Sequence, residues 1–389
     1  MSAVAAPGPL AVVGAGPVGL SAALAAHALG LPAVLLEAQP RAAAAARPGS
    51  RAIFVHRATL ELLERISPGL GEQIAARGLV WRTKRTLWAG REVHARSYRP
   101  SSAAPPFTSL PQTVVEDLLR AACDRAGIAQ HWGDPVARVA SEKGGVRLRT
   151  AGGVAHEASH VIAADGPRST VRAEAGLALR GSTSATGFVV IDVADAAGLA
   201  EPERIFHYRH PAVGGRNVLL VPFRGGWRVD VQCRPGEDGG RLIDEAPDWL
   251  PGVLPQLPAH EVTWSSVYRF QQRLASAFTD RHQRILLAGE AAHLLPPFGA
   301  RGMNSGIADA VAAARAVHTA TVPAYALARR AAAQQNIHAA AGALDHLLAA
   351  RPRRRAAQWA AAAAAPWWPR AGRWLDAAPY GPQLRAVTY

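Results

Sequence analysis

The run LAVVGAGPVGL, from Leu10 to Leu20, decides the fold of this chain. Its first four residues are apolar and predict a short buried strand, and its glycines lead into an alanine-rich helical segment over residues 20–29. A second apolar strand, residues 33–36, ends at Glu37. A strand, a helix and a strand of this size predict a β-α-β unit that opens a parallel sheet.

The spacing Gly14-x-Gly16-x-x-Gly19 predicts a dinucleotide site at this turn. Gly14 permits the tight turn, Gly16 lets the backbone approach a pyrophosphate, and Gly19 lets helix and strand pack closely. We expect the pyrophosphate on the helix N-terminus, beside Pro17 and Val18, because unpaired N–H groups and the helix dipole favour anions there.

Glu37 is the acidic partner of this unit. At the end of the second strand, its carboxylate can accept hydrogen bonds from ribose hydroxyls. It would also repel a 2′-phosphate, so the bound adenosine should belong to FAD or NAD rather than NADP. The alternative, a glycine-rich loop within a core, requires the strand, the helix and the acidic residue to coincide by chance.

Two later strands also end on a carboxylate beside glycine. The strand over 161–164 leads into Asp165 and Gly166, and the strand over 285–288 leads into Gly289 and Glu290. Strand ends of this kind can hold sugar hydroxyls at the edge of a parallel sheet. Taken alone, the Asp165 segment also fits a plain strand followed by a turn.

Composition limits the class of protein. A chain of 389 residues with 49% hydrophobic content can bury a large core in one or two domains. Its two cysteines, Cys123 and Cys233, have no metal-ligand spacing and make a disulfide framework improbable, which favours a reducing cytoplasm and no metal site.

The formal charge of +14 has two interpretations. It reflects either a compositional bias toward arginine or attraction of anions such as nicotinamide phosphates and acidic substrates. The arginines are dispersed and lack an aromatic stacking pattern, which argues against nucleic-acid binding.

No membrane insertion is expected. The apolar N-terminal segment has no preceding Lys or Arg and is broken by Gly and Pro, and the alanine run near Ala360 is short and weakly apolar.

The middle of the chain has a different periodicity. From residue 136 the apolar residues alternate, and residues 181–270 are mostly strand-like. The buried strand over 284–288 then returns to the first sheet, and helices follow from Asn304. The pattern predicts a second sheet domain inserted into the first.

In this order and spacing, the three glycine motifs resemble those of the class A FAD-dependent aromatic hydroxylases, which have the para-hydroxybenzoate hydroxylase fold. The resemblance covers residues 8–350 and is nearest to phenol and 3-(3-hydroxyphenyl)propionate hydroxylases, in the run 50–64 and the loop 296–309. Those enzymes often carry a thioredoxin-like C-terminal domain, and this chain stops near Tyr389, where that domain would begin.

The resemblance implies an α/β fold: a Rossmann-like FAD-binding domain with an inserted mixed β-sheet substrate domain and C-terminal helices. The expected division is a FAD-binding domain over 1–80, 108–180 and 276–345, a substrate-binding sheet over 81–107 and 181–275, and a helical segment over 346–389.

The resemblance also assigns cofactor contacts. Asp165 and Gly166 would help to bind both FAD and the pyridine nucleotide. Glu290 takes the place of the family's ribityl-binding aspartate and is one methylene longer, so that contact must shift or pass through water. Arg51 would reach the flavin or the pyrophosphate, and Gln112 would contact the cofactor from the start of a helix.

By resemblance, NADH or NADPH would reduce FAD, and O2 would form a flavin C4a-hydroperoxide that hydroxylates a phenolic or heteroaromatic ring. Gly302, Met303 and Asn304 open a helix whose N–H groups can face the negative edge of reduced flavin. Pro297 would place its carbonyl beside the substrate. Arg301 would either add positive charge near the flavin or be solvated.

The strand over 227–233 carries the catalytic candidates. Its odd positions are apolar, and Arg228, Asp230 and Gln232 share the other face. That face is either simply wet or lines the substrate pocket, where Asp230 could accept the phenol proton and Arg228 would be its neighbour. The further substrate candidates are Leu220, Pro222, Gln232, Tyr208 and Tyr268. His56 is an additional candidate base, and His293 is expected to be structural.

Several alternatives remain open. The same fold could serve an epoxidase or another flavin oxidoreductase, or a flavin-binding scaffold without turnover. A halogenase is disfavoured because the sequence has no Trp-x-Trp-x-Ile-Pro segment. The expected partners are a small aromatic substrate and O2, in the cytoplasm, and a homodimer is left open.

Overall fold

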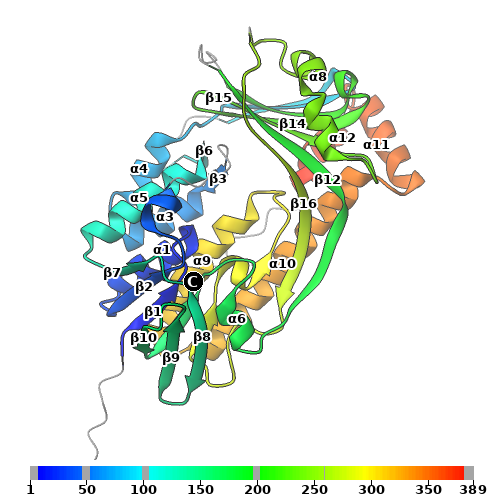
Figure 1. Cartoon of the computed structure of the whole chain (residues 1–389). Helices are drawn as coiled ribbons and strands as arrows, with labels where there is room; N and C mark the ends of the chain where they lie inside the picture. The colour runs from blue at the N-terminus through cyan, green and yellow to red at the C-terminus, as the bar shows by residue number, and fades with distance from the viewer. Residues whose placement is uncertain (1–7, 46–52, 99–104, 196–201, 258, 381–389) are drawn as a thin grey trace, which may run out of the picture.

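The structure is a computed structural model that describes residues 8–45, 53–98, 105–195, 202–257 and 259–380. Two sheets organise it, one parallel and one mixed (Figure 1). The helices are α1 Pro17–Ala28, α2 Arg41–Ala45, α3 Arg57–Ile66, α4 Leu70–Arg77, α5 Gln112–Arg125, α6 Thr170–Glu174, α7 Gly239–Asp244, α8 Ala246–Val253, α9 Arg301–His318, α10 Val322–Leu348, α11 Pro352–Ala364 and α12 Pro369–Ala377, with short 3-10 turns η1 Pro211–Val213, η2 Gly289–Ala291 and η3 Ala378–Tyr380.

The parallel sheet has the strand order β17-β11-β1-β2-β7. Its strands are β1 Leu10–Val13, β2 Ala33–Glu37, β7 Ala129–Trp132, β11 His160–Ala163 and β17 Ile285–Leu287. The three central strands are buried apolar runs, as expected for a parallel sheet covered on both faces. The carboxyl ends of β17, β11 and β1 are therefore neighbours, and each leads into one of the three glycine motifs.

The mixed sheet has the strand order β18-β16-β12-β15-β14-β13-β4-β5, and β13 and β4 are its parallel pair. Its strands are β4 Thr83–Trp88, β5 Arg91–Ser97, β12 Leu179–Ala194, β13 Glu203–His210, β14 Arg216–Phe223, β15 Gly226–Gln232, β16 Val262–Ala275 and β18 His293–Leu294. Smaller sheets comprise β3 Ile53–His56 with β6 Phe107–Leu110, and β8 Val136–Glu142 with β9 Gly145–Thr150 and β10 Ala155–Ala158.

The mixed sheet has two chemically different faces. The face that we call outer packs its valines, Trp227 and Leu220 against α7 and α8. The inner face carries Phe206, Tyr208 and Phe188, which pack with the C-terminal helices, and Val221, which packs in a cluster with Trp81 and Phe107. Figure 1 shows α8 on one side of this sheet and the parallel-sheet domain on the other.

The predicted fold class is confirmed: a parallel sheet, an inserted mixed sheet and C-terminal helices. Helix α1 begins at Pro17 rather than at residue 20, because proline is well suited to the first turn of a helix. Strand β18 joins the mixed sheet although it falls in a segment assigned to the FAD-binding domain. The exact domain boundaries stay predictions.

Candidate functional site

The first glycine motif has distinct steric roles at its three glycines. Gly14 has φ +101°, and a Cβ there would lie 2.4 Å from the carbonyl oxygen of Ala164. A Cβ on Gly19 would lie 1.8 Å from the carbonyl oxygen of Gly14. A Cβ on Gly16 would meet no described atom within 4 Å. Gly14 and Gly19 are therefore required for packing, whereas Gly16 borders open space, and the pyrophosphate contact expected there stays a prediction.

The N-terminus of α1 offers donors to that space. Pro17 is its first residue, and among the described residues no side chain caps the helix and no acid lies in its first turn. Glu37 braces the loop from β2, because the backbone N–H of Ala15 donates to Glu37 Oε2 at 2.6 Å and that of Gln39 donates to Oε1 at 3.0 Å. The ribose contact predicted for Glu37 stays a prediction.

The Asp165 motif abuts the first motif through the contact of Gly14 with Ala164. The hydroxyl of Ser169 donates to Asp165 Oδ1 at 2.5 Å, and the backbone N–H of Val171 donates to Oδ2 at 3.1 Å. Burial raises the pKa of the Asp165 carboxyl, against the opposing effect of these hydrogen bonds. Gly166 follows with φ +81°, a backbone conformation that glycine adopts readily.

The third motif meets the first at Val18. A Cβ on Gly289 would lie 2.8 Å from the Val18 side chain, and one on Gly306 would lie 2.6 Å from it. The structure thus brings together the three motifs, which lie far apart in the sequence. Glu290 is exposed next to this junction, yet surrounding protein raises its pKa, with His293 opposing.

A buried ionic network stands behind the third motif. Asp309 of α9 accepts at Oδ2 from the backbone N–H of Gly289 at 3.1 Å and lies 2.7 Å from His293 Nε2. Its other oxygen lies 2.5 Å from Arg329 Nε of α10. The prediction of a structural His293 agrees with this placement. The sequence analysis assigned Asp309 no role, because its partners Gly289, His293 and Arg329 lie in other elements of the fold.

The start of α9 is held against β3. Asn304 accepts at Oδ1 from the backbone N–H of His56 at 3.0 Å and donates from Nδ2 to the carbonyls of Phe54 and Ala300, both at 2.7 Å. His56 Nε2 lies 3.0 Å from the carbonyl oxygen of Gly299. Burial lowers the pKa of His56, and the hydrogen bond to the Gly299 carbonyl opposes this effect. The Asn304 side chain is therefore occupied within the protein, and the cofactor contact of its backbone N–H stays a prediction.

The loop before α9 is a tight turn. The carbonyl of Pro297 accepts from the backbone N–H of Ala300 at 2.9 Å, and Pro297 itself is exposed. Gly302 and Met303 lie in the first turn of α9, where among the described residues no side chain caps the helix. Arg301 is partly buried and held by other protein groups: it donates to Asn336 Oδ1 at 3.0 Å and to the carbonyl of Tyr380 at 3.2 Å.

The two remaining cofactor candidates are Gln112 and Arg51. Gln112 begins α5 as expected, and its amide donates to Glu116 Oε1 at 2.8 Å. Arg51 lies outside the described residues. The contacts of both with FAD stay predictions.

Asp230 and Arg228 lie on the inner face, as the alternation predicts. Arg228 Nε lies 3.3 Å from Asp230 Oδ1 and 3.8 Å from Asp192 Oδ1 on β12. Asp230 Oδ1 is buried and accepts no hydrogen bond from the described residues. Burial raises the pKa of Asp230 and Asp192 adds to it, whereas the charges of Arg228 and Arg204 oppose it. A carboxylate with a raised pKa is suited to proton transfer.

Two predicted substrate residues are on the wrong face. Leu220 pairs with Val229 and packs in the outer core with α7 and α8, and Pro222 pairs with Trp227 on that same side. The strand alternates, so Leu219 and Val221 face inward, opposite Asp230 and Arg228. The register of β14 against β15, which places Leu220 opposite Val229 and Pro222 opposite Trp227, would have assigned both residues to the outer face.

Tyr208 and Gln232 face inward but serve the fold. The Tyr208 hydroxyl is buried and hydrogen-bonds to His346 Nε2 at 2.8 Å and to the carbonyl of Leu375 at 2.7 Å. Gln232 contacts Asn217 and the carbonyl of Leu347, at the end of α10. Their predicted substrate contacts are wrong because the C-terminal helices cover this part of the face.

Tyr268 lies on the inner face, and its predicted substrate contact stays a prediction. It is 44% exposed, yet burial by surrounding groups raises its pKa, and the Glu290 carboxylate adds to this. Its ring centre lies 5.4 Å from that of Phe270, which lies 5.0 Å from Phe298 of the loop before α9. These aromatic rings link the inner face to the loop before α9, and no periodic pattern in the sequence marks Phe298.

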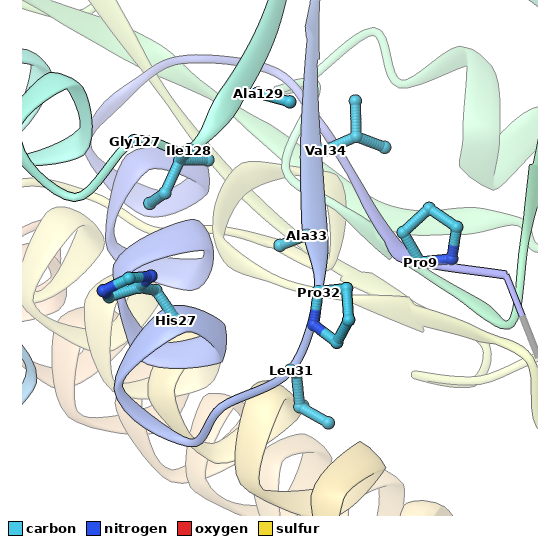
Figure 2. A pocket seen from close by; sticks show the side chains of 9 residues that line it. All are labelled: Pro9, His27, Leu31, Pro32, Ala33, Val34, Gly127, Ile128 and Ala129. Atoms are coloured by element: carbon cyan, nitrogen blue, oxygen red, sulfur yellow. The ribbon is translucent and has the colours of Figure 1, made fainter.

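A surface hollow of about 340 Å³ lies elsewhere (Figure 2). Figure 2 shows it lined by Pro9, His27 and Pro32, beside Ala33 and Ala129, the first residues of β2 and β7. Parallel sheets bind ligands at their carboxyl ends, so this hollow is not the cofactor site.

Within the described ranges, no helix is long and apolar enough to cross a membrane. No group of three or more His, Cys, Asp or Glu side chains in the same ranges is placed to hold a metal ion.

The fold and the convergence of the three motifs define a flavoprotein of the para-hydroxybenzoate hydroxylase architecture. A family model described as "FAD binding domain" matches residues 9–335. The chain therefore belongs to this FAD-binding family, and the resemblance to class A flavoprotein hydroxylases is confirmed.

Relatives by sequence agree with this assignment. The chain is 33% identical over 312 residues to 6-methylpretetramide 4-monooxygenase of Streptomyces rimosus, covering 77% of this chain and 53% of that protein. It is 29% identical over 339 residues to para-nitrophenol 4-monooxygenase of Pseudomonas sp. strain WBC-3, covering 82% of each. The chain thus spans about half the length of some relatives and most of others.

Solved structures share the fold. The p-nitrophenol 4-monooxygenase of Pseudomonas putida DLL-E4 matches with a TM-score of 0.79 at 24% identity, covering 97% of this chain and 99% of that one. The flavin-dependent monooxygenase PieE, solved with FAD and substrate, matches with a TM-score of 0.72 at 21% identity, covering 88% of this chain and 65% of that one.

Proposed function

We propose that this chain is an FAD-dependent monooxygenase that uses NADH or NADPH and O2 to hydroxylate a phenolic or heteroaromatic small molecule. The observation that carries the proposal is the convergence of the three glycine motifs, in a chain whose inserted sheet holds Asp230 beside Arg228 on its inner face. The names of the relatives support it, since they are monooxygenases of ring compounds.

The residues present fit FAD. The open space at Gly16 and the uncapped start of α1 suit a pyrophosphate, with Pro17 and Val18 beside it. Glu37 would serve the adenosine ribose, Glu290 the ribityl chain, and the backbone of Gly302 and Met303 the negative edge of the ring system. FAD, when bound, supplies the oxygen-activating redox chemistry.

The protein's own part is to orient the substrate ring and move its proton. Asp230 would accept the proton of the ring hydroxyl, which makes the ring more nucleophilic. Arg228 would hold the Asp230 carboxylate in place and stabilise its charge. The carbonyl of Pro297 and the ring of Tyr268 would border the substrate on the cofactor side.

The cellular setting is also part of the proposal. Cys123 and Cys233 are buried free thiols, which supports a reducing cytoplasm. The proposal includes both NADH and NADPH as the reductant. Arg168 in the Asp165 loop is exposed, but its presence does not discriminate between the two nucleotides.

The test is a panel of phenols and hydroxypyridines with product analysis. Purified protein should be yellow or should bind added FAD, and a productive ring should accelerate NADH or NADPH consumption and yield a product that carries one more oxygen. A protein that binds no FAD would contradict the proposal. FAD binding with no ring-stimulated oxidation would favour a scaffold, and epoxide products would favour the epoxidase alternative.

A further inference from the structure

The C-terminal helices carry an exposed aromatic surface. Trp367 and Trp368, in the turn between α11 and α12, are 84% and 58% exposed, and Trp374 of α12 is 41% exposed. Tryptophan is on average among the highly buried residues of a folded protein. Exposed apolar groups that gather in one place mark a surface that something else covers.

These tryptophans share their surface with two arginines. Helix α12 turns Ala371 and Leu375 toward the fold, and Leu375 packs there with residues of α10 and α11. Residues three and four apart lie on one side of a helix, so the exposed Arg370, Arg373 and Trp374 lie together on the side that faces away from the fold. We call the following five residues the Trp/Arg patch: Trp367, Trp368, Arg370, Arg373 and Trp374.

The charge around the Trp/Arg patch has one sign. Residues 346–375 include six arginines and no acidic residue. The acids that border this stretch are both engaged: Asp345 pairs with Arg354 at 2.9 Å, and the buried Asp376 pairs with Lys84 at 3.0 Å. The patch therefore combines apolar rings with positive charge that no nearby acid of the stretch neutralises.

The position of the patch leaves the cofactor site accessible. Figure 1 shows α11 at the outer edge of the molecule, beside the mixed sheet and on the side away from α4, α5 and the parallel sheet. The three glycine motifs follow strands of that parallel sheet. A partner that covers the patch therefore need not cover the expected cofactor site.

We propose that the Trp/Arg patch docks this protein on the surface of a bilayer that contains anionic phospholipids. An indole has an apolar ring and a polar N–H group, which suits the boundary between headgroups and acyl chains. Each arginine near an anionic bilayer should raise the affinity about fivefold, and salt screens this attraction.

The docking is peripheral. The apolar sides of α11 and α12 are already used within the protein, because Ala362, Ala365 and Leu375 belong to a buried cluster with Phe206 and Phe270 of the mixed sheet. Only the exposed indoles are left to enter the headgroup region, with the arginines beside them at the lipid phosphates.

Two other occupants fit the patch less well. A second copy of the chain would bring two arginine-rich surfaces together without carboxylates between them, and like charges across an interface are costly. Single-stranded nucleic acid binds where aromatic rings follow a basic groove, whereas Trp367 and Trp368 lie in an exposed turn between two helices.

Co-sedimentation with vesicles tests the proposal on the full chain with added FAD. One vesicle is phosphatidylcholine alone, and the other is phosphatidylcholine and phosphatidylglycerol in equal parts. Binding should be about tenfold or more tighter to the mixed vesicle, as expected for several arginines at an anionic surface. It should weaken between about 0.1 M and about 1 M salt, where the Debye length falls from about 10 Å to about 3 Å.

The double variant Trp367→Ser with Trp368→Ser tests the rings. It keeps every arginine, so its affinity for the mixed vesicle should fall about tenfold while some salt-sensitive binding is left. Both residues are exposed, so the melting temperature should not change. The matched control is Leu327→Ser, at an exposed apolar residue of α10, which should bind like the native protein.

The double variant Arg370→Gln with Arg373→Gln tests the charge. It should weaken binding to the mixed vesicle about 25-fold at low salt and make the salt dependence shallower. The matched control Arg77→Gln with Arg125→Gln removes the same charge from exposed positions of α4 and α5, and it should keep native binding.

No sedimentation with the mixed vesicle at low salt, equal binding to both vesicles, or patch variants that bind like their controls would overturn the inference. Binding of a single-stranded oligonucleotide without vesicle binding would replace the bilayer by a nucleic acid. A dimer that the tryptophan variant converts to a monomer, again without vesicle binding, would replace it by a second copy. Vesicle binding requires no turnover, so this test is independent of the proposed function.

Discussion

His293 Nε2 lies 2.7 Å from Asp309 Oδ2 in the fully buried space behind the Gly289-Glu290 turn. Burial would raise the pKa of Asp309, but Arg329 and His293 outweigh it, and the pKa is lowered. The carboxylate is therefore charged and links η2, α9 and α10 through side chains alone. The turn that should hold the ribityl chain thus depends on a buried carboxylate behind it.

Asp309→Asn should destabilise the fold and weaken FAD binding together. Removing the charge leaves Arg329 buried without its carboxylate, which typically costs about 3–5 kcal/mol. Urea unfolding and FAD titration measure the two effects. Asp345→Asn is the matched control, because its ion pair with Arg354 is largely exposed and worth about 0–1 kcal/mol. Equal unfolding free energies for the two variants would contradict the assigned role.

Gly16→Ala and Gly19→Ala should separate cofactor binding from folding. A methyl on Gly16 meets no described atom within 4 Å, so the protein should fold with near-normal stability but bind FAD at least tenfold more weakly. A methyl on Gly19 would lie 1.8 Å from the Gly14 carbonyl oxygen, so that variant should lose stability first. Thermal unfolding without FAD, followed by FAD titration, distinguishes them. A Gly16→Ala protein with normal FAD affinity would remove the pyrophosphate from this turn.

The parts of the site that could be predicted from sequence are those encoded locally. The roles of Gly14, Gly16 and Gly19 follow from one turn and its flanking elements, and the structure places them as expected. Alternation along β15 likewise put Asp230 on the polar face. Such inferences need only a period and a spacing.

The parts that could not be predicted depend on distant packing. Leu220 and Pro222 were assigned to the wrong side because the docking of α7 and α8 decides which face of β14 is covered. Tyr208 was predicted to contact the substrate, but α10 and α12 pack over it and hydrogen-bond to its hydroxyl. The contact of Arg204 with Tyr380 joins β13 to the end of the described chain, and no local pattern announces it.

Asp230→Asn should lower the rate of hydroxylation far more than it lowers FAD affinity. An amide cannot accept the proton of the ring hydroxyl, and loss of a general base typically costs about 10²- to 10⁴-fold in rate. Because its pKa is raised, native Asp230 should also produce an acid limb in the pH profile that the variant lacks. Product formation and FAD titration across pH provide the measurement.

The control for Asp230→Asn is Asp244→Asn, which makes the same change at an exposed position of α7 over the outer face. It should retain the native rate and pH profile. An Asp230→Asn enzyme that hydroxylates at the native rate would remove Asp230 from the reaction.

His346 should make the protein less stable in acid. Burial, followed by the charge of Arg354, lowers its pKa from 6.5 to about 4. As pH falls through 6.5, His346 is therefore protonated in the unfolded chain, whereas in the folded protein it stays neutral until pH approaches about 4. Stability from this group is fully present above pH 6.5 and is lost as pH falls to about 4, by about 3 kcal/mol in total.

His346→Gln keeps a polar group near Tyr208 and removes that titration. Urea unfolding between pH 7 and pH 4.5 should then show a shallower loss of stability in His346→Gln than in the native protein, even if the variant is less stable at pH 7. His338→Gln, at an exposed histidine of the same helix, should keep the native slope. Parallel pH profiles for native protein and His346→Gln would show that His346 is protonated in the fold.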